Sequence, residues 1–231
     1  MVLSYEKLII LATTIMPSVL ILAAVILSDR FREPLKPILV TFFVGVFLCF
    51  PAGLLNSILI WSQDTPEYYT FLAGLTEESL KFTAILLFVR NQADFNEPMD
   101  AIVYGTLISL GFATLENLEY VFNSKSAAES MQIATIRAIT AIPLHACCGV
   151  IMGYFFGLYA FSGQRSYLLK SLFLPMLFHA IYNFLATFSS LLTALILFGL
   201  IRYAYSLHKH FSYLQSGKTR EEERENSLNK D

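Results

Sequence analysis

The sequence predicts an all-α protein that crosses a membrane about seven times as a bundle of helices. Of its 231 residues, 55% are hydrophobic and only 15% are charged, and the mean hydropathy is +0.57. Apolar stretches of about 20 residues, the length that spans a bilayer, follow one another with short polar breaks. We therefore expect a transmembrane domain over residues 1–210 and a cytoplasmic, disordered tail over residues 211–231, which carries an EEERE run.

Seven helices are predicted when each apolar run is read against its polar flanks. They are expected at residues 7–28, 38–61, 70–90, 99–123, 134–161, 168–187 and 190–207. The first run lacks a basic n-region and a small-residue cleavage pattern, so it is read as a spanning helix rather than a signal peptide. Charged residues interrupt the third and fourth runs. A very short turn near Ser189 and Ser190 either separates the last two helices or bends one long helix.

The basic residues are distributed unevenly between the two sides of this topology. Twelve lysines and arginines follow helices on one side or close the chain, whereas only Lys7, Lys125 and Arg137 fall on the other. The positive-inside rule therefore places the N-terminus outside and the C-terminus in the cytoplasm. The basic residues form no patch, so no nucleic-acid partner is expected. The three cysteines lie in apolar stretches without a CxxC spacing and are read as buried hydrophobic residues.

Ionisable side chains inside the third helix are the first sign of a functional site. An ionised group at membrane depth costs roughly 2.5 to 3.5 kcal/mol on insertion scales, so each is a candidate for function. The helix contains Glu77, Glu78 and Lys81. Glu77 and Lys81 are four residues apart and share a face. One lysine cannot neutralise two adjacent buried carboxylates, so one of them is protonated or another cation is present.

Three further helices add polar groups at a similar depth. Glu116 and Asn117 lie on the fourth helix, His145 on the fifth, and His179 and Asn183 on one face of the sixth. Glycines at every fourth position after His145 allow a neighbouring helix to approach closely. Counted from the expected outer ends, the acidic and imidazole groups lie about 7 to 11 residues deep, on the order of 10 to 16 Å. They therefore form one layer near the outer face, with Lys81 a turn deeper.

Each of these residues alone has an ordinary structural explanation. A single transmembrane histidine or asparagine is often an interhelical hydrogen bond worth about 0.6 to 2 kcal/mol. Paired carboxylates together with imidazoles are costly for that purpose, so the combination favours an active site. Two other classes remain as alternatives. An ion-coupled transporter should show inverted repeats, and none is apparent in the sequence; a non-catalytic membrane scaffold needs no such cluster.

Four motifs in this order resemble the PrsW family of bacterial intramembrane proteases. They are Glu77-Glu78-x-x-Lys81, the stretch from Gly111 to Asn117, His145 in a glycine-containing helix, and His179-x-x-x-Asn183. The resemblance covers nearly the whole chain. The motifs are also similar to those of the CAAX-processing and bacteriocin-processing membrane proteases. The chain departs from that wider group, because Lys81 stands where an arginine one residue later is expected, and Glu116 stands where a histidine is expected.

The resemblance implies peptide-bond hydrolysis by a multi-pass protein in the lipid bilayer of a bacterial cell. The expected substrate is a membrane-anchored anti-sigma factor, cut first on the extracytoplasmic side, which activates an envelope-stress sigma factor. No oligomeric state is implied. The residues expected to take part in catalysis are Glu77, Glu78, Glu116, His145, His179 and Asn183, with Lys81 and Asn117 in support.

Two mechanisms use these residues, and the sequence leaves both open. In the first, Glu77 or Glu78 takes a proton from the attacking water, and His179 and Asn183 donate to the developing oxyanion. In the second, His145, His179 and Glu78 bind a zinc ion with an open position while the other glutamate is the base. Lys81 holds a glutamate in its ionised form in either case.

Overall fold

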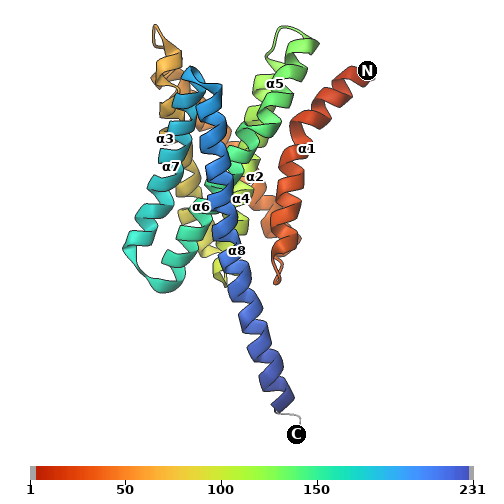
Figure 1. The fold of residues 1–231 in the computed structure, drawn as a ribbon, viewed down its shortest axis with the longest axis vertical. Coiled ribbons are helices and arrows are strands. Elements are labelled where there is room, and N and C mark those ends of the chain that lie inside the picture. The colour runs from red at the N-terminus through yellow and green to blue at the C-terminus, as the bar shows by residue number, and fades with distance from the viewer. Residues whose placement is uncertain (1–3, 229–231) are drawn as a thin grey trace.

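The computed structural model describes the backbone of residues 4–228 and the side chains of residues 4–217, and within these residues it contains helices and no strands. The helices are α1 (Tyr5–Ser28), α2 (Leu35–Leu59), α3 (Phe71–Leu87), α4 (Pro98–Phe122), α5 (Ala127–Ile139), α6 (Ala141–Ser162), α7 (Arg165–Phe188) and α8 (Ser190–Leu228). Two short 3₁₀ helices, Pro66–Tyr69 and Val89–Asn91, flank α3. The α-helices assemble into one bundle, from which the end of α8 projects on the side away from the N-terminus (Figure 1).

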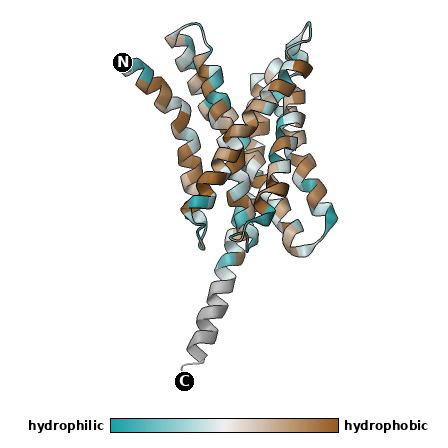
Figure 2. Ribbon diagram, turned by 180° about the vertical axis from the view of Figure 1, so that it is seen from behind, coloured by the Kyte–Doolittle hydropathy of each residue, from teal (hydrophilic) through white to brown (hydrophobic). Residues whose placement is uncertain are grey.

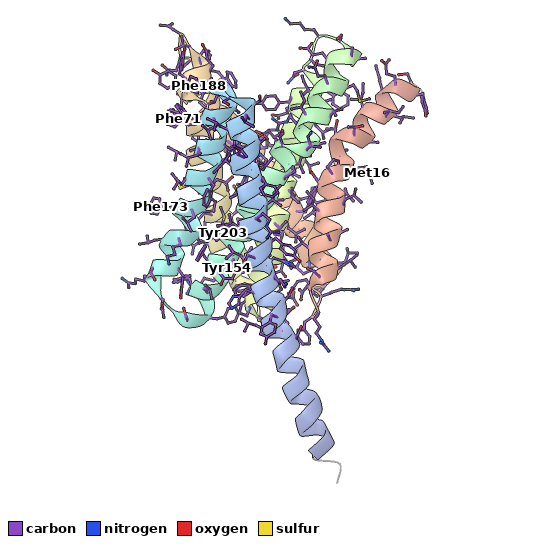
Figure 3. The ribbon with its side chains drawn as sticks, viewed as in Figure 1. Met16, Phe71, Tyr154, Phe173, Phe188 and Tyr203 are labelled. Atoms are coloured by element: carbon purple, nitrogen blue, oxygen red, sulfur yellow. The ribbon has the colours of Figure 1, made fainter. Side chains whose placement is uncertain are left out.

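The surface of this bundle suits a membrane. Six helical segments in the described part of the chain are long and apolar enough to span one, with α5 and α6 counted together. The charged and shorter α3 is not among them. Hydrophobic residues run along the helices and hydrophilic ones gather at the loops (Figure 2). Met16 on α1 and Phe173 on α7 lie at the periphery (Figure 3), each about half exposed. The predicted all-α membrane bundle is confirmed.

The predicted helix over residues 134–161 is wrong in one respect, because the chain forms two helices that meet at Thr140. Pro143 lies in the first turn of α6, where its missing N–H costs nothing, whereas inside one continuous helix it would remove a hydrogen bond. Thr140 has dihedral angles of −125° and −73° and ends α5. The break gives α5 a direction of its own, which carries Arg137 toward α4.

The last helix is longer than the predicted 190–207, and a break at Ser189 separates it from α7. Phe211 is 1% exposed and packs in the main core, and the side chain of Gln215 donates to Asp29 at 2.8 Å. Packing therefore continues past residue 210, where the sequence placed the start of a tail. The side chains of residues 218–231 lie outside the described part, and a separate cytoplasmic tail stays a prediction.

Helix α4 is the centre of the bundle, and every residue from Met99 to Thr114 is buried. Its closest neighbour is α6, and glycines allow this approach. A Cβ on Gly105 would lie 2.6 Å from the carbonyl oxygen of Gly149, and one on Gly153 would lie 2.1 Å from that of Ala101. Since His145 is one turn from Gly149 on α6, this tight contact also fixes the position of the histidine against α4.

Candidate active site

Five of the polar residues predicted to form one site meet in a single buried cluster. Glu77, Glu78 and Lys81 come from α3, His145 from α6 and His179 from α7. Each is at most 3% exposed. Three helices that are distant in sequence therefore supply two carboxylates, one ammonium group and two imidazoles to one small volume.

The helical spacing within α3 directs Lys81 toward both carboxylates. Its Nζ lies 2.7 Å from Glu78 Oε1 and 3.8 Å from Glu77 Oε2. Residues three and four apart on a helix are neighbours, which explains why one lysine reaches both. Nζ also lies 4.2 Å from the ring centroid of Phe112, so part of the charge faces an aromatic ring.

Each histidine in the cluster is paired with a carboxylate. His179 Nδ1 lies 2.9 Å from Glu78 Oε1, and His145 Nε2 lies 3.1 Å from Glu116 Oε2. An ionised carboxylate accepts the N–H of the ring nitrogen that it contacts, which leaves the opposite nitrogen with a lone pair. In this tautomer the lone pairs belong to His145 Nδ1 and His179 Nε2. The two rings are perpendicular, with centroids 5.0 Å apart.

The free ring nitrogens face different neighbours. His145 Nδ1 lies 3.0 Å from Lys81 Nζ, so the lysine already donates to it. His179 Nε2 lies 4.0 Å from Glu77 Oε2, too far for a hydrogen bond. Glu77 Oε2 and Glu78 Oε2 are buried and have no hydrogen-bond partner. The cluster thus contains unpaired acceptor atoms, which are costly unless a further donor or a cation engages them.

Glu77 is oriented by a residue that the sequence did not single out. Asn56 on α2 donates from Nδ2 to Glu77 Oε1 at 3.2 Å, and its own Oδ1 accepts from Thr76 Oγ1 at 2.6 Å. An asparagine inside an otherwise apolar predicted helix was the available signal. The contact leaves Oε2 as the unengaged oxygen of Glu77.

Arg137 is a second functional candidate that the sequence placed elsewhere, as a charge on the outer side. Its Nη2 lies 2.6 Å from Glu116 Oε2 and its Nε donates to Asn117 Oδ1 at 2.5 Å. Asn117 also donates to the backbone oxygen of Thr14 on α1 at 3.0 Å. The chain Arg137–Glu116–His145 therefore connects α5, α4 and α6, whereas Asn117 joins α4 to α1.

Asn183 lies one turn from His179 on α7 but does not contact the carboxylates. Its Nδ2 donates to the backbone oxygen of Thr70, just before α3, at 3.2 Å. The residue lines the same cavity as His179. Its amide is thus already engaged, and donation to an oxyanion would require it to leave Thr70.

Two adjoining cavities meet at the cluster. One, of about 360 Å³, is lined by polar residues that include Glu77, His145, His179 and Asn183. The other, of about 410 Å³, extends over α2 and α4 toward Glu119. Glu77 and Glu116 line both, whereas Glu78, which is fully buried, lines neither. An extended peptide lying across the two cavities would pass Glu77.

The donor set in the cluster fits a metal ion. Glu77, Glu78, His145 and His179 each offer one ligand atom, and these atoms lie within 4.8 Å of one another. Imidazole and carboxylate donors with an unfilled position are typical of catalytic zinc. Histidines held by a carboxylate at their other nitrogen are typical of metal ligands as well. Lys81 would have to release His145 Nδ1 for that nitrogen to bind a cation.

Comparison with known proteins agrees with this geometry. Residues 33–207 match the family model described as PrsW family intramembrane metalloprotease. A "Protease PrsW" of Bacillus subtilis (strain 168) is 36% identical over 185 residues, which cover 77% of this chain and 83% of that protein. Proteins of the same name in Geobacillus kaustophilus and Clostridioides difficile are 36% and 30% identical, over 76% and 83% of this chain and 79% and 85% of theirs. No solved structure matches.

Proposed function

The chain belongs to the PrsW family of intramembrane metalloproteases, and from that premise we propose that it makes the first, extracytoplasmic-side cut in a membrane-anchored anti-sigma factor. Cleavage of the anti-sigma factor then leads to activation of an envelope-stress sigma factor. The observation that carries the proposal is the buried carboxylate–histidine cluster, which opens through Glu77 to a polar cavity. Family membership makes the chain an intramembrane peptidase, which argues against the transporter and the scaffold.

The proposed outward position of the cut rests on two features. The uneven distribution of basic residues favours an outside N-terminus and a cytoplasmic C-terminus. The start of α1 and the start of α3 lie at the same end of the bundle (Figure 1), and the cavity is lined by Thr70 and Trp61 near that end. A substrate segment just outside the bilayer would therefore reach the cluster without crossing the hydrocarbon core.

We assign the role of general base to Glu77. Its carboxylate lines both cavities, and Oε2 is unengaged, whereas Glu78 is held by Lys81 and His179 behind the cavity wall. A general base must lie within reach of the water that it deprotonates. Glu78 instead fixes the tautomer of His179, and Lys81 balances its charge.

We propose that His145, His179 and Glu78 hold a zinc ion. The unpaired Glu78 Oε2 and the free nitrogen of His179 suit this role. A bound zinc would supply Lewis acidity beside the scissile peptide bond. The chain's own residues orient both imidazoles and place Glu77 at the cavity. In the metal-free alternative, His179 would carry a proton on both ring nitrogens and donate from Nε2 to the oxyanion, and Asn183 would leave Thr70 to donate as well.

The substrate proposal is tested by reconstitution. Purified protein and tagged anti-sigma factors from the same genome are placed together in liposomes, and the new termini are mapped by mass spectrometry. We expect a single first cut in the extracytoplasmic segment close to the membrane. A cut on the cytoplasmic side, or processing of other membrane proteins but of no anti-sigma factor, would contradict the proposal while leaving the protease assignment intact.

Arg137 should act as a positioning residue. Arg137→Gln removes the 2.6 Å ion pair that anchors Glu116, so the carboxylate that pairs with His145 is no longer held in place. We expect the turnover number to fall by about 10- to 100-fold, as for other groups that orient metal-ligating histidines. KM should change little, because Arg137 holds a histidine rather than the substrate.

Two matched variants accompany this measurement. Arg137→Lys should recover only part of the rate, because an ammonium group cannot bond Glu116 and Asn117 together in the geometry of a guanidinium. Lys125→Gln removes an exposed positive charge from the same end and should have no effect. Equal rates for the wild type and Arg137→Gln would show that the ion pair is not needed to orient His145.

A further inference from the structure

A second group of buried carboxylates lies at the opposite end of the bundle from the active site. Asp29 follows α1, Glu33 lies between α1 and α2, and Glu97 and Asp100 form the start of α4. They are 2%, 8%, 6% and 1% exposed. They lie at the other end of the bundle from the histidine-containing cluster, so the protease mechanism uses none of them. A buried carboxylate oxygen is costly unless a donor or a cation engages it.

Hydrogen bonds engage both aspartates and leave one oxygen of Asp29 unpaired. Asp100 Oδ2 accepts the backbone N–H groups of Asn96 and Glu97, both at 2.8 Å. Asp29 Oδ1 accepts the N–H of Phe31 at 3.1 Å and the side-chain amide of Gln215 at 2.8 Å. The carboxyl group of Asp100 also shares a hydrogen bond with that of Glu33, whereas Asp29 Oδ2 is buried and has no hydrogen-bond partner. Asp29, which is more than nine-tenths buried, thus presents an unpaired oxygen.

Neighbouring groups hold the remaining carboxylates in place. Gln215 on α8 donates to Glu97 as well as to Asp29, which brings the ends of three helices together. Tyr104 donates its hydroxyl to Glu33 Oε2 at 2.5 Å. Burial raises the pKa of the Glu33 carboxyl. The environment therefore disfavours uncompensated negative charge at this place.

The distances match the first coordination sphere of a hard cation. Asp29, Glu97 and Asp100 each offer one carboxylate oxygen, and these oxygens lie within 4.8 Å of one another. Calcium–oxygen distances are about 2.3–2.6 Å and magnesium–oxygen distances about 2.0–2.1 Å, so two ligands of one ion are separated by at most about 5 Å. Donors that are all oxygen select such ions over zinc or copper.

We propose that Asp29, Glu97 and Asp100 bind a hard divalent cation, magnesium or calcium, that ties α1 to α4 and, through Gln215, to α8. This carboxylate site is separate from the histidine-containing cluster and does not depend on the proposed substrate. Apart from this end, α1 packs mainly on α4 and α5. A bound cation would therefore stabilise the attachment of the first helix.

The test is a thermal unfolding titration of the full-length protein in detergent micelles. The protein is first treated with a chelator, and Mg²⁺ or Ca²⁺ is then added. We expect a saturable rise in the unfolding midpoint of roughly 5 to 10 °C at a hundredfold excess over Kd. Mn²⁺ titration followed by electron paramagnetic resonance should count one high-affinity oxygen-ligated ion.

Three variants test whether the rise in unfolding midpoint comes from cation binding at the carboxylate site. Asp29→Asn preserves the shape of the side chain and removes one charged ligand, so we expect the apparent Kd to rise at least tenfold. In chelator, its midpoint should equal or exceed that of the wild type, because an uncompensated charge has been removed. Glu97→Gln serves as a second ligand variant if Asp29→Asn does not fold. Glu119→Gln, an exposed carboxylate at the other end of α4, should titrate like the wild type.

The outcomes are distinguishable from those of the active-site proposals. Glu78→Gln should retain the full response to Mg²⁺ and Ca²⁺, because it alters only the histidine-containing cluster. An unchanged unfolding midpoint of the wild type in both Mg²⁺ and Ca²⁺ would overturn the carboxylate site. An equal shift in the wild type and in the ligand variants would overturn it too, whatever the protease activity of the preparation.

Discussion

Glu77→Gln should reduce peptide-bond hydrolysis by about a thousandfold, while the protein still folds. Glutamine has nearly the same shape and can still accept the hydrogen bond from Asn56 through its carbonyl oxygen. It cannot take a proton from water, and general-base catalysis contributes roughly 10² to 10⁴ in rate. The measurement is the turnover number for a peptide reporter cleaved by the purified protein in liposomes, with the unfolding midpoint recorded on the same preparation.

The adjacent glutamate gives the sharpest comparison. Glu78→Gln should also abolish activity, but it should lower stability as well, because Lys81 loses its 2.7 Å partner. Breaking a buried ion pair by removing one member costs about 3–5 kcal/mol. Glu6→Gln removes an exposed carboxylate at the start of α1, outside both cavities, and should keep the rate within about twofold. If Glu77→Gln were fully active and Glu78→Gln inactive with normal stability, the two roles would have to be exchanged.

The cluster itself was within reach of the sequence because it follows from helix geometry and depth. The i, i+4 spacing of Glu77 and Lys81 predicts a shared helix face, and Lys81 Nζ does lie within ion-pair distance of Glu77 Oε2, at 3.8 Å. Counting from helix ends predicts that His145 and His179 lie at the level of Glu77. These arguments need only the turn and rise of an α-helix and the high cost of charge in hydrocarbon.

What the sequence missed depends on how helices rotate and bend against one another. Arg137 reaches Glu116 only because the chain breaks at Thr140 and α5 leaves the axis of α6. A hydropathy pattern joins the two helices and so places Arg137 at an outer end. Asn56 meets Glu77 because α2 packs beside α3. A polar residue in an apolar helix is visible in the sequence, but the residue that it contacts is not.

The sequence did not predict the carboxylate site at the other end of the bundle, for a related reason. Asp29, Glu97 and Asp100 lie at helix ends, where a charged residue is inexpensive and is expected to be solvated. Depth therefore supplies no signal there, in contrast to Glu77 at membrane depth. Only the folded arrangement shows that these three side chains are buried together.

Metal removal should have the second large effect. Treatment of the purified protein with a strong chelator should lower the rate at least a hundredfold, and Zn²⁺ should restore it, because the family is described as metalloproteases and the donor set fits a zinc ion. Metal analysis of the untreated protein should find about one zinc per chain bound at the cluster. His145→Ala and His179→Ala should each lose this zinc.

Two further variants separate a zinc ligand from a histidine needed only for packing. His208→Gln removes a histidine that is hydrogen-bonded to Ser28, far from the cluster, and should retain both zinc and activity. Lys81→Met frees His145 Nδ1 from its ammonium neighbour, so zinc should still bind, but the charge of Glu78 would lack its partner and the rate should fall. A zinc-free wild type that resists chelation at full rate would favour the metal-free mechanism. His179→Ala would then lower the turnover number through loss of an oxyanion donor, and Glu77 would keep its role as the base.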